Sequence, residues 1–311
     1  MKSTITILIV VLLASSSVFA APLGTAARTA IPSEIQQLIS VDYRTMTSSP
    51  TALALRDKVL PDNLKEFETA LKGVGLDPGR DVDQLTFASF RSGKSGLKIV
   101  GIAQGNFAIK TFLKKMAVRK QKPLKYRLNQ IWPMSGGMQM TFLDPSTLLF
   151  GENAAVKAAL DARDGEAQSM EYNQSMLNMI SSVEDGPVWS VLDQPGTQNM
   201  MLSALGDASK LADYDMVKKR LLGSSYTMDF QNGVNFDLNV ITSDSFTAAT
   251  LSSLVKAGVM YKKATGTAVE KVALDGVSVD SDSSRLRIHF KTDDKKFQSL
   301  LNTDLFAAVS H

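Results

Sequence analysis

Histidine and cysteine, the side chains behind most catalytic and metal sites, are almost absent from this sequence of 311 residues. There is no cysteine, which excludes disulfides, cysteine nucleophiles and thiolate metal ligands. His311 is the last residue, and His289 stands between Arg287 and Lys291 in a segment that alternates like a β-strand. We expect His289 to point outward into cationic surroundings, which disfavour imidazolium and metal binding. The sequence therefore predicts no catalytic histidine, no metal site and no cofactor.

Two short motifs point to enzymes but lack the residues that would complete them. Gly93-Lys94-Ser95 resembles the end of a phosphate-binding loop, yet Ala88 stands where the motif needs its first glycine, and no helix is expected to follow. Ser95-Gly96-Leu97-Lys98 and Ser253-Leu254-Val255-Lys256 match the Ser-x-x-Lys pattern of penicillin-recognising enzymes, without the other elements of that motif set. We interpret the first motif as a hairpin turn and the other two as coincidence.

Two further patterns could bind metal ions, and each has a plainer explanation. The run from Asp280 to Ser284 is rich in Asp and Ser but lacks the central Gly and distal Glu of a calcium loop, so we expect a solvated turn. Among 14 methionines, Met138 and Met140 are spaced for one strand face, and Met176 and Met179 for one helix face. These are core spacings as well as copper(I) spacings, and we favour core packing.

Charge is distributed unevenly along the chain. The sixty residues from Gln84 to Leu143 contain eleven bases and no acid, whereas the segment from Asp144 to Gly196 contains nine acids against Lys157 and Arg163. The spacing predicts that the bases after Asn106 lie on a helix opposite its apolar stripe, and that the last two share a strand face. The candidate anion-binding residues are Lys110, Lys114, Lys115, Arg119, Lys120, Lys122, Lys125 and Arg127.

A positive surface of this size would concentrate anions around it. Outside a cell these anions would be lipid headgroups, acidic glycans or acidic proteins, and nucleic acid is not expected as a partner. The alternative is that the acidic segment folds against the basic one and neutralises it. The sequence leaves both open.

The first twenty residues have the three parts of a cleavable signal peptide. Lys2 supplies the positive charge, Ile7 to Ala14 form the apolar stretch, and Val18 and Ala20 occupy the restricted cleavage positions. The apolar stretch is shorter than the ~20 residues that a membrane span needs. We expect cleavage after Ala20, a periplasmic or extracellular location, and no transmembrane segment in the mature chain.

Periodicity predicts an α+β fold. We expect a disordered lead at 21–30, a first half over 31–165, a connecting helix within 166–186 and a second half over 187–308. Each half is expected to be an antiparallel sheet with helices packed on one face. Within the first half, 40–46 looks like a strand, and the helix after Asn106 should bury Ile109, Phe112, Leu113 and Met116.

The two halves repeat the same order of elements, which suggests an internal duplication. Phe90 corresponds to Phe230 at a separation of 140 residues, and Leu97 to Phe236 at 139. The helix after Asn106 then corresponds to the helix that begins at Ser245. A duplication requires these two helices to lie on the same face of their sheets.

Three segments resemble a family of uncharacterised secreted bacterial proteins. They are the turn from Gly75 to Asp83, Gly105-Asn106-Phe107 and Leu149-Phe150-Gly151. The resemblance implies export and an α+β fold, and it implies no activity.

The sequence favours a non-enzymatic exported binding module whose basic region engages an anionic envelope surface, a glycan or an acidic partner. One alternative is a carboxylate-based hydrolase of envelope or extracellular glycans, which would need paired acids in a cleft. Another is a structural subunit of a secreted assembly, which would need an exposed apolar patch or sheet edge.

Overall fold

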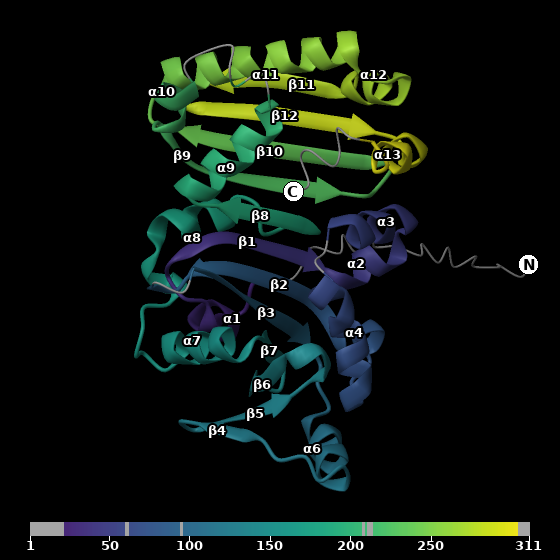
Figure 1. The fold of residues 1–311 in the computed structure, drawn as a ribbon, viewed down its shortest axis with the longest axis vertical. Helices are drawn as coiled ribbons and strands as arrows, with labels where there is room; N and C mark the ends of the chain where they lie inside the picture. The colour runs from purple at the N-terminus through teal and green to yellow at the C-terminus, as the bar shows by residue number, and fades with distance from the viewer. Residues whose placement is uncertain (1–21, 60–61, 94–95, 207–208, 210–213, 304–311) are drawn as a thin grey trace, which may run out of the picture.

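The structure, a computed structural model, describes residues 22–59, 62–93, 96–206, 209 and 214–303. The strands form one continuous sheet of twelve strands in the order β11-β12-β10-β9-β8-β1-β2-β3-β7-β6-β5-β4, and every neighbouring pair is antiparallel (Figure 1). This confirms the α+β class. The proposed leader over 1–20 and its cleavage point lie outside the described residues.

The sheet runs the length of the molecule, with β11 at one end and β4 at the other. The strands are β1 (Ile35–Asp42), β2 (Val82–Arg91), β3 (Leu97–Gly105), β4 (Leu124–Tyr126), β5 (Asn129–Pro133), β6 (Gln139–Asp144), β7 (Thr147–Gly151), β8 (Val188–Leu192), β9 (Leu221–Asp229), β10 (Val234–Thr242), β11 (Val277–Asp282) and β12 (Arg285–Thr292).

The helices connect these strands and pack on the sheet. They are α1 (Thr25–Ala30), α2 (Tyr43–Ser48), α3 (Pro50–Val59), α4 (Asp62–Val74), α5 (Pro78–Asp81), α6 (Ile109–Val118), α7 (Asn153–Arg163), α8 (Gln174–Ile180), α9 (Gln194–Leu205), α10 (Tyr214–Lys218), α11 (Ser245–Thr265), α12 (Ala268–Leu274) and α13 (Asp294–Leu300). Short 3₁₀ turns cover Ser135–Gly137 and Met170–Tyr172.

Helices cover both faces of the first half, because its strands are apolar on both sides. On β7, Leu149 packs into a core with α1, α7 and α8, whereas Leu148 and Phe150 pack into a second core with α4 and α6. Successive side chains of a strand point to opposite faces. We call these the α7 face and the α6 face. The expectation of helices on one face therefore does not hold for the first half.

The described part of the second half carries its main core on the α6 face. The cross-strand partners Leu238 and Tyr226 pack with Met201 of α9 and Leu251 of α11. The opposite side of β12 presents polar residues to solvent: Arg285, Arg287, His289 and Lys291. Most of β9 to β12 follows the expected single-faced arrangement, whereas Trp189 and Val191 of β8 pack into the core with α7 and α8 on the other face.

The two halves meet where β1 pairs with β8. Residues paired across neighbouring strands point to the same face of the sheet. Successive pairs link Leu85 to Val41, Val188, Met228 and Phe236. Because Leu85 packs in the core with α6 and Phe236 in the core with α11, these two helices lie on the same face. That is the arrangement the duplication requires.

The closing helices break the correspondence between the halves. The first, α7, packs on the α7 face, whereas α13 packs on the α6 face against Val234 and Phe290. An internal duplication therefore stays a prediction, and it would require one closing helix to have changed sides.

Two of the expected segments differ in the structure. Within the lead, Thr25–Ala30 forms α1, and Leu23, Ala27 and Ala30 are buried in the core with α7. Small side chains allow α1 to pack closely, so a composition typical of disorder forms part of the core. The connector over 166–186 holds a 3₁₀ turn and the short helix α8 in place of one long helix.

Candidate functional site

The predicted anion-binding residues gather at the β4 end of the sheet. We call residues 109–133, which comprise α6, the following segment and the β4–β5 hairpin, the basic end. Helix α6 follows β3 and buries Phe112 and Met116, with the Phe112 ring 5.4 Å from Trp132 and 5.2 Å from Phe142 between centroids. Because this apolar stripe faces the core, the basic residues of α6 point outward.

All eight candidate residues are exposed. Two of them fold back onto the end of α4: Lys115 donates to the carbonyl of Gly75 at 3.5 Å, and Arg119 donates to that of Gly73. The carbonyls at a helix C-terminus carry partial negative charge, so they attract cations without cancelling their charge. Lys115 and Arg119 are thus positioned and still cationic.

Five lysines of the basic end have no ion pair with any residue that the structure describes. Their ammonium groups are available to an external anion. They are Lys110, Lys114, Lys120, Lys122 and Lys125.

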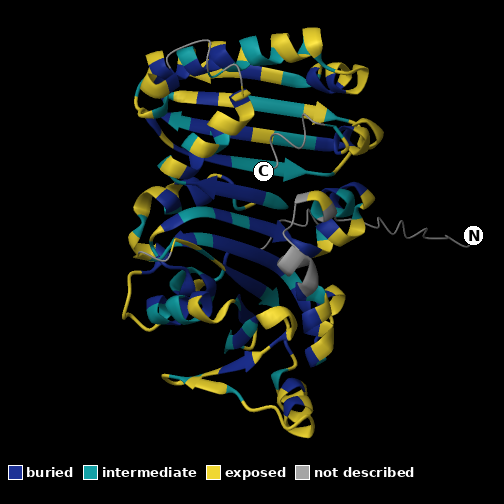
Figure 2. Ribbon diagram, viewed as in Figure 1, coloured by how far each residue is buried: buried dark blue, intermediate teal, exposed yellow. Residues whose placement is uncertain are grey.

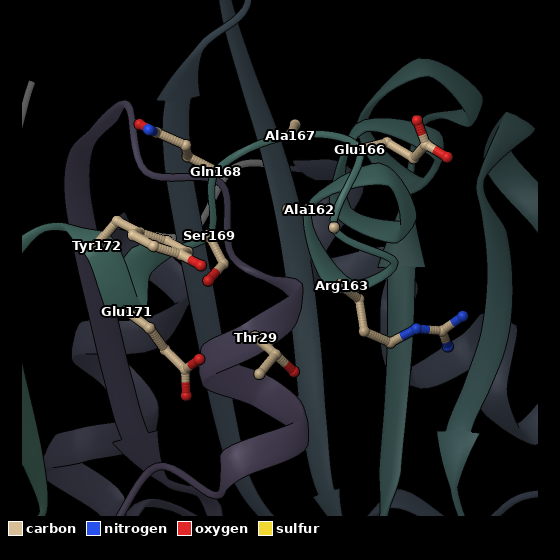
Figure 3. Close-up of a pocket in the computed structure, with 10 residues that line it drawn as sticks. Thr29, Ala162, Arg163, Glu166, Ala167, Gln168, Ser169, Glu171 and Tyr172 are labelled. Carbon is tan, nitrogen blue, oxygen red and sulfur yellow. The ribbon is translucent and has the colours of Figure 1, made fainter.

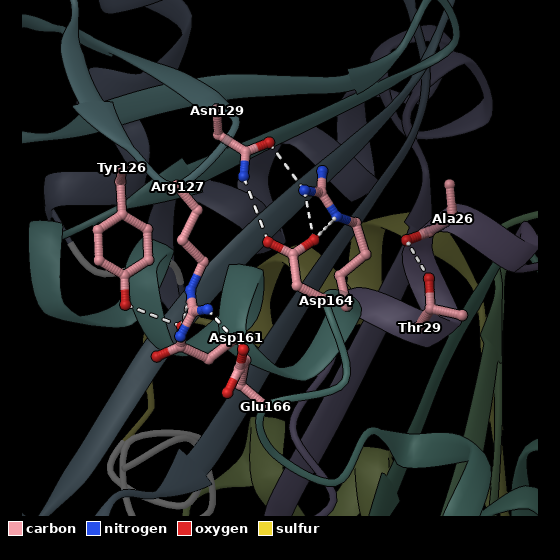
Figure 4. Close-up of polar contacts among 9 residues, drawn as sticks. Ala26, Thr29, Tyr126, Arg127, Asn129, Asp161, Asp164 and Glu166 are labelled. Atoms are coloured by element: carbon pink, nitrogen blue, oxygen red, sulfur yellow. Dashed lines mark hydrogen bonds and ion pairs between the residues drawn. The ribbon is translucent and has the colours of Figure 1, made fainter.

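Arg127 differs from the other candidates because it is paired with acids. Its guanidinium contacts Asp161 at 3.0 Å and Glu166 at 2.7 Å (Figure 4). Hydrogen bonds with Tyr126 and Glu166 raise the pKa of Arg127 above its usual range. Arg127 lies in the turn after β4 with φ of 51°, so it does not share a strand face with Lys125 as expected. Arg127 is therefore not a free cation.

In the part of the chain that the structure describes, five of the nine acids of segment 144–196 form ion pairs, three of them with residues outside the basic end. Asp164 binds Arg163 at 2.7 Å, Glu184 binds Arg28 at 2.7 Å, and Asp193 binds Arg91 at 2.7 Å. One of those three partners, Arg91, still belongs to the acid-free stretch 84–143. Among the described residues, Arg127 is the one candidate that this segment neutralises. The neutralisation alternative accounts for one residue in eight.

Exposed apolar side chains lie among the lysines of the basic end. Leu113 is 40% exposed, Val118 77%, Leu124 45% and Leu128 100%. Leu113 was expected in the buried stripe of α6, so its exposure differs from the prediction, and no prediction concerned the other three residues. The available signal was that Leu124 and Leu128 follow one another at i, i+4 in a segment too polar to form a core.

A hollow of about 420 Å³ lies beside the pairs of Arg127, between α1 and the C-terminal end of α7 (Figure 3). Two carboxylates line it, as the hydrolase alternative requires, but both Glu166 and Glu171 are exposed and Glu166 is held by Arg127. Apolar burial is one way to raise the pKa of a carboxyl group so that it can act as a general acid, and neither glutamate has such burial; the hydrolase alternative stays a prediction. The lining residues are Thr29, Ala162, Arg163, Gly165, Glu166, Ala167, Gln168, Ser169, Glu171 and Tyr172.

The surroundings of His289 differ from the expectation. It points away from the core, as predicted, but the register places Asp237 opposite it, and its Nδ1 lies 2.8 Å from the Asp237 carboxylate. The cationic neighbourhood inferred from Arg287 and Lys291 is thus incomplete, because the facing strand supplies an acid.

Neither a metal-binding cluster of His, Asp and Glu nor a helix long and apolar enough to cross a membrane occurs within the described ranges.

Comparison with known proteins gives a likeness of fold. No family model and no curated protein matches the chain. The structure of crystal form I of TP0453 matches with a TM-score of 0.50 and 8% identity, over 91% of this chain and 96% of that one. Crystal form III of the same protein matches with a TM-score of 0.49 and 8% identity, over 90% and 97%. At this identity the likeness shows the fold alone.

Proposed function

We propose that this chain is an exported, non-enzymatic binding module that holds an anionic envelope surface with its basic end. The observation that carries the proposal is that seven of the eight predicted cations are exposed and have no acidic partner among the described residues. Export rests on the leader over 1–20 and is part of the proposal.

The number of free cations sets the expected strength of binding to an anionic surface. Each Lys or Arg close to an anionic surface contributes on the order of 1 kcal/mol at low salt. The seven remaining residues could thus hold the protein reversibly without a lipid anchor. Salt should weaken this binding, because at 0.1 M the attraction between exposed charges is largely screened beyond a Debye length of about 10 Å.

The test is co-sedimentation of the mature chain with anionic and neutral vesicles at low and high salt. Charge reversal by Lys110→Glu, Lys114→Glu and Lys120→Glu should weaken binding to anionic vesicles by on the order of 100-fold, since three contributions are lost. These side chains are exposed, so the fold should be unchanged.

A matched control reverses three exposed lysines at the other end of the sheet: Lys256→Glu, Lys262→Glu and Lys271→Glu on α11 and α12. It changes the net charge equally but should leave most of the binding. Equal losses in both triple variants would mean that net charge, and not the basic end, governs binding. No binding to anionic vesicles at low salt would overturn the proposal.

A further inference from the structure

We propose that the surface bound by the basic end is a lipid bilayer, and that the end inserts apolar side chains below the headgroups. This rests on the proposed function and adds a second, uncharged contact. Its basis is the set of four exposed apolar residues among the lysines: Leu113, Val118, Leu124 and Leu128.

Exposed apolar residues are common on protein surfaces, and others lie on α11 and α12, but these four share one end of the molecule with the free cations of the basic end. Leu113 and Val118 belong to α6, whereas Leu124 and Leu128 belong to the β4–β5 hairpin. Both elements lie at the β4 end of the sheet in Figure 1, and Figure 2 shows that much of this end is exposed. The arrangement places apolar and cationic side chains on the same extremity.

The geometry of the hairpin accounts for the full exposure of Leu128. The two turn residues between β4 and β5 are Arg127 and Leu128. The Tyr126 hydroxyl donates to Asp161 at 2.8 Å, and Arg127 binds Asp161 and Glu166 (Figure 4). Both residues before Leu128 are thereby tied to α7 and its following loop. The turn is fixed, and Leu128 is its projecting tip.

This combination fits one kind of partner best. An anionic bilayer offers phosphate groups to the ammonium groups of Lys122 and Lys125, and directly beneath them an apolar phase for Leu124 and Leu128. An acidic polysaccharide has the charge but no apolar phase. Binding to such a polymer would therefore not depend on the leucines.

The absence of cysteine allows a site-specific probe. Leu128→Cys carries an environment-sensitive fluorophore, and Phe246→Cys, at a residue 75% exposed on α11 near the other end of the sheet, is the matched control. Both proteins are mixed with vesicles of phosphatidylcholine and phosphatidylglycerol, with and without quencher-labelled acyl chains. We expect a blue shift and acyl-chain quenching at position 128 and neither at position 246.

A second variant measures the contribution of the apolar residues to binding. Leu128→Ser together with Val118→Ser should weaken vesicle binding about tenfold, because two apolar contacts with the bilayer are lost, while binding to an acidic polysaccharide and the thermal unfolding midpoint stay unchanged. Phe246→Ser should change none of these quantities.

The outcomes separate the two proposals. If the protein binds vesicles in a lysine-dependent way but the fluorescence at position 128 does not change, insertion is refuted and the proposed function is unaffected. Equal insertion at positions 128 and 246 would refute the assignment to the basic end. A loss of polysaccharide binding in the serine variant equal to its loss of vesicle binding would also refute a bilayer-specific contact. No binding at all would overturn both proposals.

Discussion

Arg91, at the end of β2, forms an ion pair of 2.7 Å with Asp193, which caps α9 on the other side of β1. The same carboxylate accepts from the backbone N–H of Gly196 at 2.8 Å. One side chain thus satisfies a helix N-terminus of the second half and a cation of the first half.

Asp193→Ala should lower the free energy of unfolding by about 1–2 kcal/mol, because it removes an N-cap and the partner of Arg91. Asp193→Asn keeps a side-chain oxygen that accepts the N-cap hydrogen bond, and it should lower the free energy of unfolding by less. Urea denaturation monitored by Trp fluorescence measures both, since Trp189 is fully buried next to this junction. A wild-type midpoint for Asp193→Ala would contradict this account.

Asp244, the N-cap of α11, should contribute to stability in a pH-dependent way. The hydrogen bond from the backbone N–H of Thr247, together with that from the Ser243 hydroxyl, lowers the pKa of Asp244 to about 2. Because the folded-state pKa lies below the unfolded value of about 4, the contribution is complete above about pH 4 and is lost as pH falls towards 2.

The check compares the wild type with Asp244→Ala by urea denaturation between pH 2 and pH 6. The difference in unfolding midpoint should be constant above pH 4 and shrink below it. A difference that does not change with pH would show that the charge of Asp244 is not involved.

Gly101 on β3 should tolerate no side chain. A Cβ there would lie 2.2 Å from the ring of Phe150, which is stacked on Phe67 with centroids 3.8 Å apart. We expect Gly101→Ala to destabilise the protein by about 1–3 kcal/mol, because either the ring stack or the strand pairing must shift.

Gly73 is the matched control for that substitution. It lies in α4, is exposed, and a Cβ there would meet nothing within 4 Å. Gly73→Ala should therefore stabilise the protein by about 0.5–1 kcal/mol, as alanine does in a helix. Thermal unfolding of the two variants should shift in opposite directions, and equal shifts would contradict the assigned environments.

The mature N-terminus is expected to be Ala21, because Val18 and Ala20 occupy the cleavage positions. Mass spectrometry of protein recovered from outside the cytoplasm checks this directly. Recovery of exported protein that still begins at Met1 would be the contrary result.

Local patterns predicted the β2–β3 hairpin and the helices α6 and α11, because these depend on neighbours in sequence. The hairpin is confirmed, and both helices are observed. The strand expected over 40–46 ends at Asp42, since Asp42 accepts from the backbone N–H of Thr45 and caps α2. A capping acid at a strand end was a readable signal.

Long-range relations could not be read in the same way. Nothing local shows that β1 pairs on both sides and joins the halves into one sheet. The pairing of Arg127 depends on α7, which brings Asp161 to it from 34 residues away. The free lysines of α6 were predictable because exposure on an amphipathic helix is local, whereas the exposure of Leu128 depends on how its turn is held.

The continuous sheet also fixes a length. Twelve antiparallel strands spaced by about 4.8 Å set the two edge strands roughly 50 Å apart. A molecule bound to a surface by its β4 end would therefore hold β11 and α11 several Debye lengths away from that surface, beyond the reach of its potential. Whatever meets that far edge would do so in bulk solvent.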